Sequence, residues 1–262
     1  MIRISIVTIT FNAERCLQRT QDSVARQTYP YIEHLIVDGA SKDGTVAIAW
    51  RYQKESRHEV VVSSEPDKGL YDAMNKGLQR ATGDYVVFLN AGDALHAKDT
   101  IETVVNSLTP DPSPLTSELP AVVYGDTAIT DTEGRFLHLR RLRPPKVLTW
   151  RSFRQGMLVC HQAFYARLDL ARTLPYDLQY RHSADVDWCI RIMKEADRLG
   201  LLLVNANAIL ADFEEGGNTT QNHRASLLER YRVMVRHYGC VQTFLLHCWF
   251  VVRAVISRIS GR

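Results

Sequence analysis

The chain has 262 residues, a length that suits one large α/β domain with a full hydrophobic core and is short for two. Hydrophobic residues make up 45% and charged residues 23%, an ordinary globular composition that excludes a disordered or fibrous protein. The formal net charge of +3 conceals an asymmetry, because residues 1–130 carry 12 Lys and Arg against 17 Asp and Glu, whereas residues 131–262 carry 20 against 12, so the two halves are expected to face different partners.

Strand and helix signals alternate through the first 95 residues. Apolar runs rich in β-branched residues predict strands at residues 4–10, 32–37, 60–62 and 85–89. Helical patterns lie between them, at residues 12–27 with Asn12 as the cap, at 45–55 and around 70–78. This order predicts an α/β fold with a single doubly wound, mostly parallel sheet flanked by helices, in which a ligand binds at the carboxyl ends of the strands.

Polar, turn-forming segments follow all four of these strands, at residues 10–12, 38–39, 65–69 and 90–93. Turn chemistry explains any one of them. Because the carboxyl ends of parallel strands meet at one edge of a sheet, the four together predict a binding rim.

The second half of the chain begins with a segment rich in Pro, Ser, Thr and Asp at residues 109–120, which predicts a surface loop. Strands are predicted at residues 121–130 and 136–141, joined as a hairpin near Gly134, and helices at residues 185–199 and 225–238. From residue 241 onward, apolar residues recur at helical spacing beside arginines, which predicts an amphipathic, basic C-terminal helix.

Three common nucleotide-binding or catalytic motifs are missing from the sequence. The first strand is followed by TFNA rather than by the G-x-G-x-x-G fingerprint, and neither a P-loop nor a G-x-S-x-G nucleophile elbow occurs. A sheet that binds a diphosphate without a glycine-rich cradle needs another counter-charge, and a carboxylate-held metal ion is the expected one.

Seven motifs in a fixed order carry a family resemblance. They are SIVTITFN at residues 5–12, IVDGASKDGT at 36–45, DKGLYDAMNKG at 67–77, GDYVVFLNAGD at 83–93, CHQAFY at 160–165, YRHSADVDW at 180–188 and EGGNTT at 215–220. The set resembles glycosyltransferase family 2, and its later motifs are similar to the branch that builds bacterial exopolysaccharides and glycolipids, such as the colanic-acid type. The resemblance covers about residues 3 to 222.

The resemblance implies a GT-A fold and an inverting transfer of a sugar from a nucleotide-diphosphate sugar, UDP- or GDP-linked, with Mg²⁺ or Mn²⁺ as the cofactor. It implies one glycosyltransferase domain at residues 1–238, with a nucleotide-sugar-binding half at 1–95 and an acceptor-binding half at 96–238. The amphipathic tail follows at residues 239–262.

On the donor side, Asp93 matches the last carboxylate of the family's Asp-x-Asp-Asp metal motif, and Asp38 matches the acidic residue that contacts the base or ribose. A helix cap for Asp93 and a turn-forming role for Asp38 are the structural alternatives. The other residues expected around the nucleotide sugar are Thr10, Asn12, Asp67, Gly69, Asn75, Asn90 and Ala91.

On the acceptor side, Asp185 matches the family's catalytic Asp, which takes the proton of the attacking hydroxyl as a general base. Asp187 is the rival for this role, and its alternative is to orient the acceptor or to cap the helix that carries Trp188, which we also place on this side. His161 and Gln162 are expected to support the acceptor side of the pocket, with a purely structural role as the alternative for His161.

Two segments depart from the family pattern. Residues 90–92 read NAG, so both acidic positions of Asp-x-Asp are lost and Asp93 remains. Residues 73–75 read AMN where the family has Ala-Arg-Asn, and Lys68 or Lys76 is the candidate substitute for the phosphate-binding Arg. A non-catalytic sugar-nucleotide-binding partner of a glycosyltransferase complex is therefore one alternative function. A nucleotidyltransferase is a weaker one, since residues 10–15 lack a glycine-rich, basic loop.

Basic residues concentrate in the second half, with seven between Arg135 and Arg154 and with seven Arg against one acidic residue in 224–262. A solvated face is the bland explanation of the first group. An anionic lipid surface or a lipid-linked glycan acceptor fits the charge better than nucleic acid, for which no aromatic platform or reading motif is present. The alternatives for the tail are packing of its apolar face on the domain and a homodimer contact.

Cysteine usage and hydropathy bear on the compartment. Five scattered cysteines without a C-x-x-C pair indicate a reducing compartment and no zinc site. The first residues are typical of a strand rather than of a signal peptide, and no stretch is long and apolar enough to mark a clear membrane span. We therefore expect a cytoplasmic protein, peripheral on the inner face of the cytoplasmic membrane.

Overall fold

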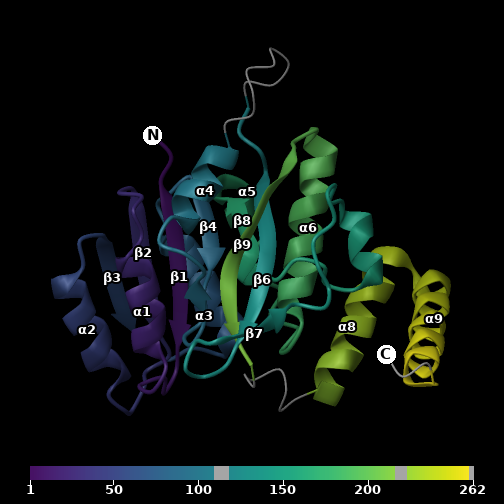
Figure 1. Cartoon of the computed structure of the whole chain (residues 1–262), viewed down its shortest axis with the longest axis horizontal. Coiled ribbons are helices and arrows are strands. Elements are labelled where there is room, and N and C mark those ends of the chain that lie inside the picture. The colour runs from purple at the N-terminus through teal and green to yellow at the C-terminus, as the bar shows by residue number, and fades with distance from the viewer. Residues whose placement is uncertain (109–117, 216–222, 260–262) are drawn as a thin grey trace.

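The structure is a computed structural model that describes residues 1–108, 118–215 and 223–259 (Figure 1). Its elements are β1 (Ile4–Thr10), α1 (Leu17–Ala25), β2 (Ile32–Asp38), α2 (Thr45–Glu55), β3 (Glu59–Ser64), α3 (Leu70–Arg80), β4 (Tyr85–Phe88), β5 (Ala94–Leu95), α4 (Thr100–Ser107), β6 (Val122–Thr130), β7 (Phe136–Leu139), η1 (Trp150–Gln155), η2 (His161–Ala163), β8 (Phe164–Arg167), α5 (Leu168–Thr173), α6 (Ala184–Leu199), β9 (Leu203–Glu214), α8 (His223–Tyr238) and α9 (Cys240–Ile259). The predicted surface loop at 109–120 and the EGGNTT motif lie mostly outside the described residues.

One sheet organises the described residues, with strand order β3-β2-β1-β4-β8-β6-β9-β5 and with β7 paired to β6. The four strands from the first part of the chain are parallel, as predicted. The second part is mixed, because β8 runs antiparallel to both β4 and β6, whereas β9 is parallel to β6. The sheet is therefore a mixed α/β sheet.

Helices cover both faces of the sheet, which explains the continuous apolar run of β4. Val86 and Phe88 pack in one buried cluster with α3 and α6, whereas Tyr85 and Val87 pack in a second cluster with α1 and α4. Successive side chains of a strand point to opposite faces, so the strand has no solvated side. This burial fixes the position of the segment that follows β4.

The first helix begins at Leu17, later than predicted, and Asn12 is not its cap. Asn12 has a φ of 51°, which lies in the left-handed region and cannot belong to a helix. Its side-chain oxygen accepts a hydrogen bond from the backbone nitrogen of Lys42 at 2.9 Å, and its own backbone nitrogen donates to Ser41 Oγ at 2.8 Å. Asn12 therefore joins two neighbouring strand-end loops.

The remaining predicted elements of the second half are present. β6 and β7 form the expected hairpin, and α6 and α8 begin within two residues of the predicted helices. The C-terminal segment forms α9, and among the described residues no helix is long and apolar enough to cross a membrane. Figure 1 shows α9 beside α8, at the opposite end of the molecule from α2.

Gly77 allows α3 to approach β1 closely, and this contact gives a testable expectation. A Cβ atom at this position would lie 2.4 Å from Val7 Cγ1. We expect Gly77→Ala to lower the free energy of unfolding by about 1–3 kcal/mol through overpacking, although alanine is the better helix former by about 1 kcal/mol. Urea unfolding followed by circular dichroism measures the change.

The control is Val7→Ala, which removes the methyl group that the new Cβ would meet. The double variant should be more stable than the sum of the two single losses predicts, because the clash is gone. Strictly additive losses would show that α3 and β1 do not meet at Gly77.

Candidate functional site

Asp38 organises the rim formed by the carboxyl ends of β1, β2 and β3. Its side chain is fully buried and accepts hydrogen bonds from Thr10 Oγ1 at 3.0 Å, from Ser64 Oγ at 2.7 Å and from the backbone nitrogen of Ser41 at 2.9 Å. The Ser41 hydroxyl also donates to it. Asp38 therefore aligns three hydroxyl groups on this rim. For the Asp38 carboxylate itself to contact a ligand, one of these hydroxyls must turn away.

Asp67 and Gly69 close the rim on the side of α3. Asp67 lies against Gly39, because a Cβ atom on that glycine would lie 2.4 Å from Asp67 Oδ2. The backbone nitrogen of Gly69 donates to Asp67 Oδ1 at 2.8 Å. Together with Asn12, which is bonded to the loop after β2, these residues lie at the strand-end rim.

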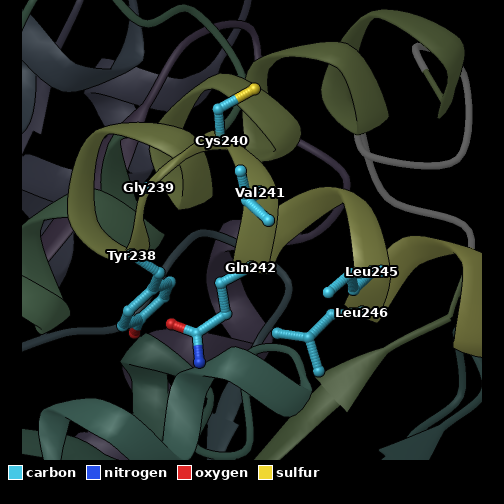
Figure 2. A pocket seen from close by; sticks show the side chains of 7 residues that line it. All are labelled: Tyr238, Gly239, Cys240, Val241, Gln242, Leu245 and Leu246. Carbon is cyan, nitrogen blue, oxygen red and sulfur yellow. The ribbon is translucent and has the colours of Figure 1, made fainter.

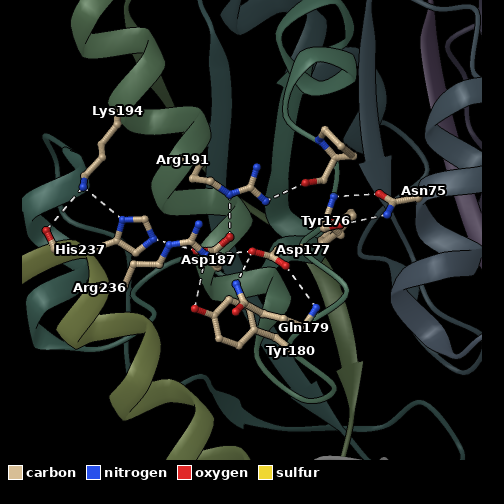
Figure 3. Close-up of polar contacts among 11 residues, drawn as sticks. Asn75, Tyr176, Asp177, Gln179, Tyr180, Asp187, Arg191, Lys194, Arg236 and His237 are labelled. Carbon is tan, nitrogen blue, oxygen red and sulfur yellow. Dashed lines mark hydrogen bonds and ion pairs between the residues drawn. The ribbon is translucent and has the colours of Figure 1, made fainter.

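Asn75 holds the loop in front of α6. Its side-chain nitrogen donates to the backbone oxygen of Tyr176 at 3.0 Å, and its side-chain oxygen accepts from the backbone nitrogen of Tyr176 at 2.8 Å (Figure 3). Both ends of the amide are engaged in this contact. The observed role of Asn75 is therefore to join α3 to the segment that leads to Asp185.

Asp93 lies beyond β4 and is only 4% exposed. Gln162 Nε2 donates to Asp93 Oδ2 at 2.7 Å, and the backbone nitrogen of Glu214 donates to Oδ1 at 3.2 Å. Burial raises the pKa of Asp93 to about 6, although these hydrogen bonds oppose the shift. A buried carboxylate with a raised pKa at a ligand rim is typical of a functional group rather than of a helix cap.

The neighbouring residues offer oxygen atoms for a cation that is shared with a ligand. Asn90 Oδ1 is buried and has no hydrogen-bond partner, and each oxygen of Asp93 accepts one hydrogen bond and keeps a free lone pair. Within the described parts of the chain, no three His, Cys, Asp or Glu side chains converge on a metal position. Mg²⁺ is commonly held by one or two carboxylates together with phosphate oxygens. The residues thus fit a diphosphate-bound ion and do not form a protein-only metal site.

Glu214 is a site residue that the sequence did not reveal. A Cβ atom on Gly92 would lie 3.1 Å from Glu214 Oε2, so this carboxylate lies beside a position that is acidic in the family pattern. Arg19 NH1 pairs with Glu214 at 3.4 Å. No motif marked Glu214, because it comes from the end of β9, far along the chain. Ala91 packs nearby against the cluster of α1 and α2.

Asp185 stands in the first turn of α6 and has two side-chain partners. His161 Nδ1 lies 3.4 Å from Asp185 Oδ2, and the Tyr71 hydroxyl donates to Oδ1 at 3.2 Å. Burial pushes the pKa of Asp185 up, but the hydrogen bond and charge of His161, together with the charge of Arg230, hold it below its usual value. The carboxylate is therefore ionised at neutral pH, as a base must be.

His161 and Gln162 connect the two sides of the site from adjacent positions in η2. Asn90 Nδ2 lies 3.2 Å from His161 Nε2. The ring of His161 thus turns Nε2 toward Asn90 and Nδ1 toward Asp185. Gln162, the next residue, bonds Asp93 at 2.7 Å.

Asp187 is a structural ion-pair residue, unlike Asp185. It is fully buried, and it accepts from Arg191 Nε at 2.6 Å and from His237 Nε2 at 2.8 Å (Figure 3). Burial raises its pKa, but the contacts with His237 and Arg191 outweigh this and lower it overall. Because His237 belongs to α8, Asp187 attaches α8 to α6. The structure therefore favours Asp185 over Asp187 as the group that faces a substrate.

Trp188 is a core residue, which corrects its predicted place on the acceptor side. It is fully buried and stacks on Tyr176 at 4.9 Å between ring centroids, with Phe88 at 5.7 Å on another side. The helical spacing explains this, because position 188 lies on the face of α6 that meets the sheet. An acceptor cannot reach this ring without unpacking the core.

Glu229 of α8 binds the segment that precedes α6 in the chain. No sequence pattern marked Glu229 as a functional residue. It accepts hydrogen bonds from the backbone nitrogens of Arg181 at 2.9 Å, His182 at 2.7 Å and Ser183 at 3.1 Å. A carboxylate at a helix N-terminus satisfies amides that lack an intrahelical partner. α8 therefore fixes the backbone that precedes Asp185.

Comparison with known proteins places this geometry in a family. Glycosyl transferase family 2 matches residues 5–170. The PGL/p-HBAD biosynthesis glycosyltransferase of Mycobacterium bovis is 34% identical over 218 residues, which cover 81% of this chain and 77% of that protein.

Two solved structures show the same fold. S. aureus TarS 1-349 in complex with UDP-GlcNAc has a TM-score of 0.67 at 16% identity, over 89% of this chain and 64% of that one. The mannosyltransferase PcManGT from Pyrobaculum calidifontis, in complex with GDP-Man and Mn²⁺, has a TM-score of 0.62 at 19% identity, over 90% of this chain and 64% of that one. The predicted fold class is confirmed.

The raised pKa of Asp93 makes stability depend on pH. Its ordinary value of 3.8 applies to the unfolded chain, and about 6 to the folded one, so the folded state binds the proton more tightly and loses stability as pH rises between these values. Relative to Asp93→Asn, the native protein should lose about 2–3 kcal/mol of unfolding free energy between pH 4 and pH 7. Urea unfolding in EDTA without nucleotide measures this difference.

Asp169→Asn is the control, because the side chain of Asp169 is 65% exposed. This variant shows what removal of one mostly exposed carboxylate does to stability at each pH. A stability difference for Asp93→Asn that does not change with pH would contradict the raised pKa of Asp93.

Proposed function

Because the chain belongs to glycosyl transferase family 2, we propose that it transfers a sugar from a nucleoside-diphosphate sugar to a glycan acceptor, with inversion at the sugar carbon. The observation that carries this proposal is the pair His161 and Gln162, which joins the ionised Asp185 to the donor rim at Asn90 and Asp93. A base beside the donor site is what a single displacement requires. Family membership sets aside the nucleotidyltransferase alternative, and the chain is a glycosyltransferase rather than a non-catalytic partner.

The nucleoside binds at the rim that Asp38 organises. Thr10, Ser41 and Ser64 present hydroxyls there, and Asn12 and Asp67 flank them. Hydroxyl and carboxylate groups suit the hydroxyls of a ribose and the N–H groups of a base. The solved relatives were determined with UDP-GlcNAc and with GDP-Man, which supports a UDP- or GDP-linked donor here.

The diphosphate binds at residues 90–93, where Asp93 and Asn90 would hold Mg²⁺ or Mn²⁺ together with its phosphate oxygens. The ion supplies stabilisation of the negative charge on the departing diphosphate. Mn²⁺ in the PcManGT complex supports this cofactor. Gln162 keeps Asp93 in place through its 2.7 Å hydrogen bond. The division into a donor half at 1–95 and an acceptor half at 96–238 follows from these roles.

Asp185 is the general base. As the acceptor hydroxyl oxygen bonds to the anomeric carbon, its proton passes to Asp185, and the bond from that carbon to the diphosphate breaks with its electron pair. His161 donates to Asp185 from Nδ1, and Tyr71 donates to the other oxygen, so the carboxylate is held in one orientation. Attack on the face opposite the leaving group inverts the configuration.

The acceptor is a lipid-linked glycan, and the enzyme works at the cytoplasmic face of a membrane in glycolipid or polysaccharide synthesis. The M. bovis relative is named for PGL/p-HBAD biosynthesis, which supports this acceptor class. All five cysteines, Cys16, Cys160, Cys189, Cys240 and Cys248, are free thiols, as a reducing compartment allows.

Replacing the base tests the reaction. Asp185→Asn should lower single-turnover transfer by about 10²–10⁴-fold, because the amide cannot take the proton, while nucleotide affinity stays near the native value. A thermal-shift panel of UDP, GDP, CDP and dTDP, with and without Mn²⁺, first identifies the donor base, since a bound ligand raises apparent stability. Transfer is then followed as nucleoside diphosphate release with a glycolipid extract as acceptor.

Asp197→Asn is the matched control, because Asp197 lies in the last turn of the same helix and bonds Trp150 instead. It should retain native transfer. Native turnover in Asp185→Asn would rule out Asp185 as the base, and a loss of nucleotide binding in that variant would place it on the donor side instead.

A further inference from the structure

The first half of α9 turns its polar side toward the protein and its apolar side toward solvent. Thr243 is fully buried, and the His247 ring packs edge-on against Tyr231 of α8 at 5.0 Å. These two residues are four positions apart, so they share one helix face. The opposite side carries four large apolar residues that are 57–75% exposed: Val241, Phe244, Leu245 and Trp249.

This orientation decides against packing of the apolar face on the domain, which was one explanation of the tail. A helix that stabilises a fold does so by burying its apolar stripe. Here no described part of the chain covers the stripe defined by Val241, Phe244, Leu245 and Trp249, which we call the α9 stripe. Contiguous exposed apolar side chains of this size mark an interaction surface.

A groove adjoins the α9 stripe at Val241 and Leu245. It lies where α8 turns into α9, has a volume of about 660 Å³ and is mainly apolar (Figure 2). Its lining residues are Tyr238, Gly239, Cys240, Val241, Gln242, Leu245 and Leu246. Figure 2 shows Leu245 and Leu246 close together on α9, so the stripe and the groove share a border.

The segment that carries the α9 stripe is basic in sequence, because residues 230–262 contain six Arg and no Asp or Glu. The neighbouring turn η1 adds Arg151, whose guanidinium lies 4.3 Å from the Trp150 ring centroid, and Arg154, which lies 5.5 Å from the Tyr238 ring centroid. An apolar surface with cationic flanks is complementary to a bilayer that contains anionic lipids, where each Arg adds about 1 kcal/mol of attraction.

From this combination we propose that the α9 stripe is a docking surface for an anionic lipid bilayer. α9 lies in the interface with Phe244, Leu245 and Trp249 inserted among the acyl chains, and Arg151 and Arg154 of the adjacent turn η1 lie near the headgroups. A second copy of the chain is a weaker partner, since two surfaces of the same positive charge would repel each other. Nucleic acid would match the charge but leave the apolar side chains in water.

The surface is attached to the catalytic segment through α8. Glu229 and His237, both on α8, hold the residues in front of Asp185 and the ion pair of Asp187. Docking of α9 thus brings the acceptor side of the site to the membrane. The docking surface is independent of the identity of the donor and of the base, so it goes beyond the proposed reaction.

Vesicle flotation of the full chain tests the docking surface. The protein should float with vesicles of phosphatidylcholine and phosphatidylglycerol and much less with phosphatidylcholine alone, and raised salt should weaken the binding. The combined variant Phe244→Ser, Leu245→Ser and Trp249→Ser should bind the anionic vesicles more than about tenfold less tightly. Trp50→Ser is the control, because Trp50 of α2 is also exposed, at 54%, but lies at the far end of the molecule.

Nucleotide thermal shift of the combined variant must remain native, which shows that the fold and the donor site are intact. Equal binding to neutral and anionic vesicles, or native vesicle binding by the combined variant, would overturn the proposal. So would a concentration-dependent dimer that this variant abolishes in the absence of vesicle binding, since the stripe would then be a contact between two copies. If the native protein binds the anionic vesicles but transfers no sugar, the proposed reaction is contradicted and the docking surface is not.

Discussion

Two hydrogen-bonding side chains of one short turn hold the halves of this site together. His161 contacts Asp185 and Asn90, and its neighbour Gln162 contacts Asp93. The turn η2 reaches this position because β8, which follows it directly, inserts antiparallel between β4 and β6. The rim segment leaves β4 at the same place. A change in this strand pairing would separate the base from the donor rim, so the mixed sheet is a condition of the chemistry.

Buried charge in the site falls into two kinds. Asp185 and Asp187 have cationic or hydrogen-bonding partners, and both pKa values lie below the ordinary one. Asp93 has neutral partners in contact, and its pKa rises to about 6. Its burial therefore opposes folding at neutral pH, as expected of a group whose partner is a ligand rather than the protein. Glu214 and Arg19 form an ion pair beside it.

Much of the fold followed from the sequence, because β-branched runs and helical spacing are local signals. The rim residues Asp38 and Asp67 were predictable, since strand ends and turn chemistry place them. The start of α1 was not, because the left-handed conformation of Asn12 depends on contacts with a distant loop. Glu214 and Glu229 act from other strands and helices, and no local pattern marks them. Trp188 was misplaced, because a motif match does not say which face of α6 is buried.

The central claim is that His161 tunes and orients Asp185 as the base, and the pH dependence of single-turnover transfer tests it most directly. With donor and Mn²⁺ at saturating concentrations, which keep Asp93 ionised, the rate of the native enzyme should fall on the acidic side only at a pH below the usual range of an aspartate, because His161 lowers the pKa of Asp185. In His161→Gln burial of Asp185 remains and the charge of the ring is lost, so the acidic limb should move to higher pH. An unchanged limb in that variant would contradict the account.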